Sequence, residues 1–233
     1  MQLHIDARVF VIITIIFLNG EAFGQNRPES FTFNFTRVQE SVNALDTLSG
    51  IAFFFYGKLY LHVRHPINQI FFVDGNKIKI YYPENKTGYR IMSGTPFDLP
   101  IVNSLLASLE DDYGLAQIGF EIRSTSVLGD TLVTNWEHST GSDAGTFDVF
   151  YRNDIIVKAR FNAPSVSLET VLKNHKTYNG YVIPTTIKTR HSAIRDSVTE
   201  TLYVDGLFIN PYIPESILNF EFPDEAVIEE RRL

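Results

Sequence analysis

The chain lacks cysteine altogether, and its 233 residues include only one tryptophan and two methionines. Without cysteine, no disulfide can stabilise the fold and no lipidated cysteine can anchor the protein to a membrane. Basic residues are in the minority, since 27 Asp and Glu outweigh 20 Lys and Arg and give a formal net charge of −7. This balance argues against nucleic acid and anionic membrane surfaces as main partners. The fold must therefore depend on its hydrophobic core, for which the chain is long enough.

The common sequence signals of catalysis are missing as well. Residues 141–145 begin and end with glycine, but Ser142 is in the wrong place for a nucleophile elbow, and no glycine-rich phosphate loop occurs. His62 and His65 lie three apart in a predicted strand, which directs them to opposite faces and disfavours joint metal binding. We therefore expect no catalytic residue, no metal and no cofactor. A hydrolase that uses scattered Asp and His residues is the alternative that these absences disfavour most.

The N-terminus has the pattern of a secretory signal peptide. A basic residue precedes an apolar run from Val9 to Leu18, and small residues follow at Ala22 and Gly24. These ten residues extend only about 15 Å as a helix, well short of a hydrocarbon core of about 30 Å. The sequence thus predicts a signal peptide at residues 1–24 and a single exported domain at residues 25–233. An uncleaved N-terminal anchor is the alternative.

Two segments have the periodicity of amphipathic helices. The first runs from Thr36 to Leu48 and starts with a Thr-x-x-Gln capping box. Its apolar residues Val38, Val42 and Leu45 follow at i, i+4 and i+7. The second runs from Pro100 to Asp112, where a proline suited to the first helical turn precedes a broad apolar face. The sequence predicts a helix at each place.

Elsewhere the pattern has a period of two, which is typical of strands. Turn residues separate the segments, and Asp74-Gly75 is a strong hairpin signal. Connections this short allow antiparallel pairing only. We predict about eleven or twelve strands in one mainly β domain, because the helices are too few for an α/β fold. The predicted strands are Ile51–Tyr56, Lys58–Arg64, Gln69–Val73, Lys77–Tyr82, Tyr89–Met92, Gln117–Ser124, Thr131–His138, Thr146–Arg152, Ile155–Asn162, Val166–His175, Tyr181–His191 and Ser197–Val204.

The strands carry more apolar side chains than a sheet with one solvated face needs. Lys58–Arg64 alternates cleanly, whereas Ile51–Tyr56 and Ile70–Val73 are apolar on both faces. The chain has 19 Phe and 11 Tyr residues, which would suit a curved sheet with helices over its concave side. A hydrophobic hollow would remain if the helices covered the sheet loosely. A fully packed β-sandwich or barrel is the simpler explanation of the composition alone.

Several segments occur in the order and spacing of a known family. A helical pattern leads into Leu48–Phe53, and Gly57–Leu61 begins a strand that ends in a basic-Pro step at His65-Pro66. Residues 66–83 contain an apolar strand, Asp-Gly, a second strand and Tyr-x-Pro, and Ile217–Pro223 has the form of a closing Phe-x-Phe-x-Pro strand. In these features the chain resembles the outer-membrane lipoprotein carrier (LolA) family, as a divergent member. The resemblance spans nearly the whole chain after the predicted signal peptide.

The resemblance implies an open or incomplete antiparallel β-barrel of about eleven strands, with a helical lid over a hydrophobic cavity. It implies a periplasmic carrier that binds acyl chains of lipoproteins, or a related lipid, and shuttles them from the inner to the outer membrane. An inner-membrane ABC exporter would load this carrier, and an outer-membrane acceptor would receive its cargo. We expect a monomer. An exported, non-enzymatic protein-interaction or sensor domain of the same shape is the alternative.

Candidate site residues follow from this implied architecture and from the alternation of the strands. The family also has a lid-latch arginine directly before its proline, where this chain has His65, with Arg64 one residue earlier. Because a shift of one residue in a strand changes the face, neither residue is an unaltered counterpart of that latch. The candidate cavity wall comprises Phe53, Phe55, Leu59, Leu61, Val63, Phe72, Ile78 and Ile80 from the strands, and Val102, Leu105, Leu106 and Leu109 from the predicted lid.

Overall fold

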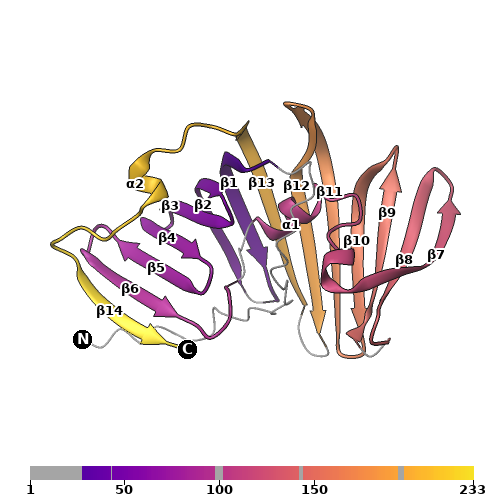
Figure 1. Ribbon diagram of the computed structural model, residues 1–233, viewed down its shortest axis with the longest axis horizontal. Helices are drawn as coiled ribbons and strands as arrows, with labels where there is room; N and C mark the ends of the chain where they lie inside the picture. The colour runs from indigo at the N-terminus through magenta and orange to yellow at the C-terminus, as the bar shows by residue number, and fades with distance from the viewer. Residues whose placement is uncertain (1–27, 43, 98–101, 142–143, 194–196) are drawn as a thin grey trace.

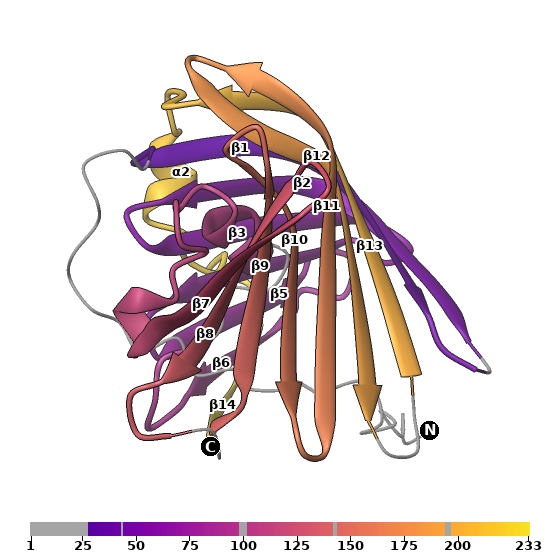
Figure 2. The same cartoon turned by 90° about the vertical axis from the view of Figure 1, so that its right-hand side faces the viewer.

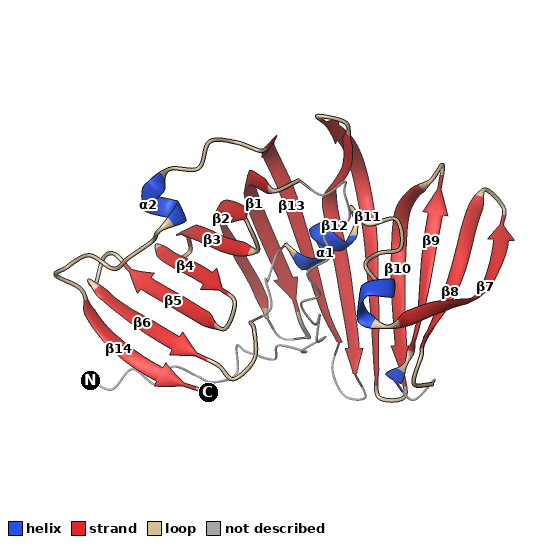
Figure 3. Cartoon of the chain, in the orientation of Figure 1, coloured by secondary structure: helices blue, strands red, loops and turns tan. Residues whose placement is uncertain are grey.

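The computed structural model describes residues 28–42, 44–97, 102–141, 144–193 and 197–233. The predicted signal peptide lies outside this part of the chain. The described residues form one sheet of fourteen strands, with two short α-helices and one 3-10 helix (Figures 1 and 3). Two views at right angles show that the sheet is strongly curved and twisted (Figures 1 and 2).

The chain builds the sheet in two series of strands with a helical segment between them. The first series is β1 (Ser30–Glu40), β2 (Leu45–Phe55), β3 (Lys58–His65), β4 (Gln69–Asp74), β5 (Lys77–Tyr82) and β6 (Thr87–Met92). Helix α1 (Asn103–Ala107) and the 3-10 helix η2 (Ala116–Ile118) follow. The second series is β7 (Phe120–Leu128), β8 (Thr131–His138), β9 (Thr146–Arg152), β10 (Ile155–Ala163), β11 (Val166–Tyr178), β12 (Tyr181–Ala193) and β13 (Ser197–Ile209). Helix α2 (Glu215–Leu218) and β14 (Val227–Arg232) complete the chain.

The sheet is open at both ends. In spatial order the strands are β14-β6-β5-β4-β3-β2-β1-β13-β12-β11-β10-β9-β8-β7, so β14 and β7 form its edges. β14 pairs with β6 in parallel, which the long connection after β13 allows, and the other neighbours pair antiparallel. The mainly β architecture with few helices is confirmed. The barrel of about eleven strands is corrected to an open sheet of fourteen strands among the described residues.

The predicted helix from Thr36 to Leu48 is wrong, because this segment contributes to a hairpin of β1 and β2. Phe31, Phe33 and Phe35 alternate along β1 and are at most 2% exposed, so they fix which face of the strand is buried. Val42, part of the predicted helical stripe, is 78% exposed. β1 also pairs with β13 on its other side, and these distant hydrogen bonds outweigh a local helical preference.

The second predicted helix is too long, and the closing strand is misplaced. Of Pro100–Asp112, residues Asn103–Ala107 form an α-helix, while residues 98–101 lie outside the described part of the chain. Ile217–Pro223 contains the end of α2 and a loop instead of a strand. The last strand is β14, and its sequence V-I-E-E-R-R has little of the alternation that identifies a half-buried strand.

Side chains that alternate along the strands form two separate cores, one on each face of the sheet. The larger core covers one face of the sheet, which we call the inner face. In the spatial order of the strands it extends from β5 through β1 and β13 to β7, and it includes α1. The smaller core lies on the opposite, outer face, where Phe220 after α2 packs against Tyr60 and Phe72. Adjacent residues such as Leu59 and Tyr60 in β3 therefore belong to different cores.

Candidate functional site

The inner face is an apolar surface that runs across most of the sheet. Register places its side chains next to one another on neighbouring strands, as Phe31 lies between Phe54 and Ile209. Such a continuous apolar surface binds either the protein's own side chains or an apolar ligand. The buried residues that the strands contribute are Phe31, Phe33, Phe35, Ala52, Phe54, Leu59, Leu61, Val63, Val73, Phe120, Trp136, Phe147, Val149, Ile156, Ala159, Leu172, Ile183, Ile187, Leu202, Val204, Leu207 and Ile209.

A short segment covers the centre of this face. We call residues 102–118 the lid, which consists of α1, a series of turns and η2. Figure 1 shows α1 in front of β11 and β12, and α1 is in contact with β12. Val102, Leu105 and Leu115 are at most 1% exposed, because they pack into the same core as the sheet side chains. The lid side chains thus occupy the inner face where a hollow was expected.

The lid is held together by its own hydrogen bonds. The carboxylate of Asp112 accepts hydrogen bonds from the amides of Gly114 and Ala116, each at 2.9 Å. The Ser108 hydroxyl donates to the Leu105 carbonyl at 2.7 Å. These bonds satisfy backbone groups near the ends of the two short helices. The internal hydrogen bonds of the lid therefore do not involve the sheet.

Several hydrogen bonds join the lid to the sheet. The Tyr151 hydroxyl of β9 donates to the carbonyl of Asp111 at 2.9 Å. Tyr113 of the lid is 7% exposed and forms a hydrogen bond with Thr170 of β11. Burial raises the pKa of Tyr113, and its hydrogen bonds oppose this shift. Apolar contact therefore supplies most of the attachment of the lid, with these bonds to orient it.

The structure divides the predicted cavity residues between the two faces. Phe53, Phe55 and Phe72 lie in the outer core, so their assignment to the wall of the same cavity is wrong. Both faces of β2 and β4 are apolar, and this hides the direction of each side chain in the sequence. The other strand residues, Leu59, Leu61, Val63 and Ile78, lie on the inner face, Ile80 alternates in step with Ile78, and Val102, Leu105, Leu106 and Leu109 of the lid pack with the inner core.

The inner face carries an arginine that sequence reasoning missed. The latch candidates Arg64 and His65 are both exposed, where the pairing of β2 with β3 shifts register. Arg37 instead lies on the inner face, since it continues the alternation of Phe35 in β1 and is paired with the buried Leu202 of β13. The prediction of a helix over this segment concealed that alternation.

Arg37 belongs to a group of polar side chains, which we call the polar end of the inner face: Arg37, Gln39, His191 and Glu200. Arg37 Nε donates to Glu200 Oε2 at 2.6 Å, and the same guanidinium donates to the side-chain oxygen of Gln39. Burial lowers the pKa of His191, and the nearby charge of Glu200 opposes this effect while that of Arg37 adds to it. The apolar surface therefore ends in a patch that contains one charge of each sign and a neutral imidazole.

The lowered pKa of His191 predicts a loss of stability in mild acid. Because the folded-state pKa lies below the unfolded value of about 6.5, the unfolded chain binds more protons as the pH falls through this window. Thermal unfolding should therefore occur at a lower temperature near about pH 5 than near about pH 8. His191→Gln should reduce this difference, whereas His65→Gln, at an exposed site, should not. An equal pH dependence in both variants would contradict the prediction.

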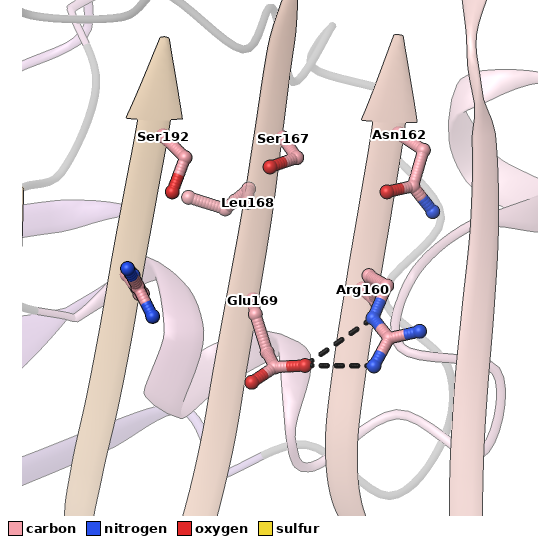
Figure 4. Close-up of a pocket in the computed structure, with 7 residues that line it drawn as sticks. Arg160, Asn162, Ser167, Leu168, Glu169 and Ser192 are labelled. Atoms are coloured by element: carbon pink, nitrogen blue, oxygen red, sulfur yellow. Dashed lines mark hydrogen bonds and ion pairs between the residues drawn. The ribbon is translucent and has the colours of Figure 1, made fainter. Parts of the chain in front are cut away.

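Two open pockets lie outside the packed centre. One, of about 450 Å³, lies between Ser108 and Leu109 of the lid and the β11–β12 hairpin at residues 179–182. The other, of about 310 Å³, is a polar groove formed by β10, β11 and β12, where Arg160 donates two hydrogen bonds to Glu169 (Figure 4). Among the described residues, no group of three or more acidic, histidine or cysteine side chains could hold a metal. No described helix has the length and apolarity needed to cross a membrane.

Solved structures with the same fold include those of three bacterial proteins. A DUF1329 family protein from Desulfovibrio piger is similar with a TM-score of 0.54 and 12% identity, over 83% of this chain and 90% of that one. A LolA superfamily protein from Nitrosomonas europaea is similar with a TM-score of 0.53 and 15% identity, over 82% and 90%. A domain named for outer membrane lipoprotein sorting, from Vibrio parahaemolyticus, has a TM-score of 0.51 and 11% identity, over 82% and 89%.

These likenesses concern the fold. No family model matches the sequence, and no curated protein matches it. The structural similarity nevertheless extends over more than four fifths of the chain in each comparison. The resemblance to LolA is therefore confirmed at the level of the fold. In this chain, however, strand β1 is found where the sequence predicted the first helix.

Proposed function

We propose that this protein is a carrier that holds the acyl chains of a lipoprotein, or of a related lipid, against its inner face without catalysing a reaction. The carrier works in the periplasm after export by the predicted signal peptide. The LolA-like fold supports this proposal, because a LolA superfamily protein and a domain named for lipoprotein sorting share it. The observation that carries it is the lid, whose apolar side chains already occupy the surface that acyl chains would need.

The lid and the cargo compete for the same surface. In the absence of lipid, Val102, Leu105 and Leu115 cover the inner face and keep it from water. When acyl chains arrive, the lid moves away and the chains take the place of these side chains. The hydrogen bonds inside the lid persist during the exchange, so the movement breaks mainly apolar contacts and a few hydrogen bonds to the sheet.

The energies of the two states are similar enough to make binding reversible. An acyl chain of about fifteen methylenes gains ~12 kcal/mol on burial, at ~0.8 kcal/mol per methylene. Returning the four largest buried side chains of the lid (those of Val102, Leu105, Tyr113 and Leu115) to water costs ~6–12 kcal/mol, at ~1.5–3 kcal/mol each. One chain therefore displaces the lid with little gain, whereas two or three chains do so readily. Burial of three chains would give ~36 kcal/mol, which exceeds the practical limit of ~18–21 kcal/mol for non-covalent binding free energy. Competition from the lid brings the net binding free energy closer to that limit.

Two buried leucines distinguish this exchange from ordinary core packing. Leu105 of the lid is 1% exposed and Leu172 of the sheet is 2% exposed, so truncation of either to alanine leaves a similar void. Leu105→Ala weakens the hold of the lid and should tighten binding of a fluorescent diacyl lipid about five- to tenfold. Leu172→Ala removes part of the lipid-binding surface and should weaken it.

The measurement is a fluorescence titration of delipidated protein, with thermal unfolding recorded for both variants. Both melting temperatures should fall, because each variant loses buried apolar contacts. Opposite changes in lipid affinity are the expected result. Affinity lowered in parallel with stability in both variants would show that the lid is part of a permanent core, and the exchange would then be disproved.

Protein docking is a second candidate function, and one edge of the sheet favours it. Along β7 all residues after Phe120 are exposed, including Ile122, Val127 and Leu128 at 53%, 73% and 70%. An edge strand with free backbone groups and exposed apolar side chains can pair with an extended segment of another protein. If delipidated protein takes up no diacyl lipid, this docking function becomes the better explanation of the fold.

The carrier proposal also includes two partners. An inner-membrane exporter would load the carrier, and an outer-membrane acceptor would receive its cargo.

A further inference from the structure

The polar end lies on the same face as the apolar surface, and its Glu200 is two strands away from Thr170, which contacts the lid. Thr170, which bonds the lid residue Tyr113, is paired in register with Thr189, and Thr189 is paired with Glu200. Glu200 is in turn paired with Gln39 of β1. A row of polar side chains thus leads across the inner face from the lid to the Arg37–Glu200 ion pair.

The ion pair is accessible and also in contact with the buried surface. The side chains of Arg37 and Glu200 are 27% and 29% exposed. Arg37 is paired with Leu202 on one side and with Leu48 on the other, and both leucines contact the inner core. His191 lies beside this pair, and its Nδ1 is buried without a hydrogen-bond partner among the described residues. An unsatisfied buried nitrogen is costly unless a ligand or water bonds to it.

We infer that the polar end binds the headgroup of a zwitterionic diacyl lipid, with its phosphate at Arg37 and its ammonium group at Glu200. This inference rests on the proposed carrier function and specifies its cargo. The acyl chains lie along the apolar part of the inner face, and the glycerol region lies near the Thr170–Thr189 pair. His191 Nδ1 then has a bonding partner in the phosphate or ester oxygens.

Charge matching explains why the headgroup is zwitterionic. Arg37 and Glu200 neutralise each other in the ligand-free state, at 2.6 Å. A headgroup with one positive and one negative group exchanges partners with this pair and leaves no charge unpaired. An anionic headgroup satisfies Arg37 but leaves Glu200 uncompensated and next to a second negative charge. Such a juxtaposition of like charges lowers affinity and so provides selectivity.

The test compares three lipids with identical acyl chains as competitors of a fluorescent diacyl lipid: phosphatidylethanolamine, phosphatidylglycerol and uncharged diacylglycerol. We expect the wild-type protein to prefer phosphatidylethanolamine to phosphatidylglycerol by about tenfold, as the loss of one charge-assisted contact produces. Glu200→Gln removes the repulsion and should abolish or reverse this preference. Arg37→Gln should weaken binding of both phospholipids and leave diacylglycerol unchanged.

Two further variants control for charge and for folding. Glu221→Gln breaks the Lys79–Glu221 ion pair on the outer side and should leave all three affinities unchanged. The exchange Arg37→Glu with Glu200→Arg keeps an ion pair in place, so it should fold and retain the preference for the zwitterionic lipid. Equal affinity for the two phospholipids, unaltered by Glu200→Gln while diacylglycerol still binds, would overturn the headgroup site and leave the carrier function standing. Failure of all three lipids to bind would overturn both.

Discussion

Cross-linking the lid to the β11–β12 hairpin is expected to reduce uptake of diacyl lipid to background. Ser108 and Asn179 line the same pocket from the lid and from the hairpin. Cysteines at these two positions would be the only ones in the chain, because the sequence has none. A flexible bismaleimide linker then holds the lid on the inner face, where its side chains block the surface that acyl chains need. Stopped-flow fluorescence with a labelled diacyl lipid measures the effect.

The control for this experiment joins two strands without restraining the lid. Lys188 of β12 and Thr201 of β13 are paired in register, and cysteines there can take the same linker. Uptake by this second protein should match that of the wild type. With a cleavable linker, uptake by the lid-linked protein should return when the linker is cut. Normal uptake while the lid is still linked would show that lipid enters by another route and that the lid does not exchange with it.

The strands that the sequence located correctly are those joined by short turns. β5, β8 and β9 have the predicted bounds, and the turns between neighbouring strands in this part of the chain carry Gly, Asn or Asp. In such hairpins, the turn residues and the alternation of about a dozen flanking residues are enough to predict the two strands. Local pattern therefore sufficed for these three strands, each of which pairs with a strand adjacent to it in sequence.

β1 was not identified in this way, because a helical pattern overlaps its hairpin with β2 and its other partner, β13, is distant in sequence. Thr36 to Leu48 has a capping box and an apolar spacing that fit a helix. The contrary signal was the alternation of Phe31, Phe33 and Phe35, which directly precedes the predicted helix. Pairing with β13, more than 150 residues away, decides between the two, and no local window contains it.

The division between the two faces was equally hidden. In β2 the sequence Phe53-Phe54-Phe55 places aromatic rings on both sides of the sheet. The outer core exists because Phe220, from the segment after α2, packs against Tyr60. Without that packing partner, the sequence offers no reason to place Phe53 and Phe55 outside rather than inside. The lid residues Leu105 and Leu106 were identified because a helix contacts a sheet with one face only.

Arg37 shows how an error in secondary structure conceals a site. In a helix its side chain would have been one more solvated charge. In β1 it lies two residues after Phe35 and faces the inner core, where it meets Glu200 of β13. The ion pair could only be found once the pairing of these two strands was known. A candidate site assembled from distant strands is thus less predictable than the fold that holds it.

Replacement of Gly50 by alanine is expected to lower the free energy of unfolding by about 3–5 kcal/mol, among the largest effects of a single added methyl group. A Cβ atom at this position would lie 2.1 Å from the carbonyl oxygen of His62 and 2.9 Å from the Cα of Val63. Both atoms belong to the backbone of β3, which cannot move aside as a flexible side chain can. The close approach arises where the pairing of β2 with β3 shifts register between Ser49 and Gly50.

Gly94→Ala is the matched control, because a Cβ atom there meets nothing within 4 Å. Its effect should stay within about 0.5 kcal/mol, as for most surface substitutions. Urea denaturation followed by circular dichroism measures both variants, and a lower midpoint at an unchanged slope indicates a loss of stability alone. Similar midpoints for the two variants would mean that β2 and β3 lie farther apart at Gly50 than the structure has them. The expected result would show that Gly50 is required for the contact between β2 and β3, two strands that carry the inner face.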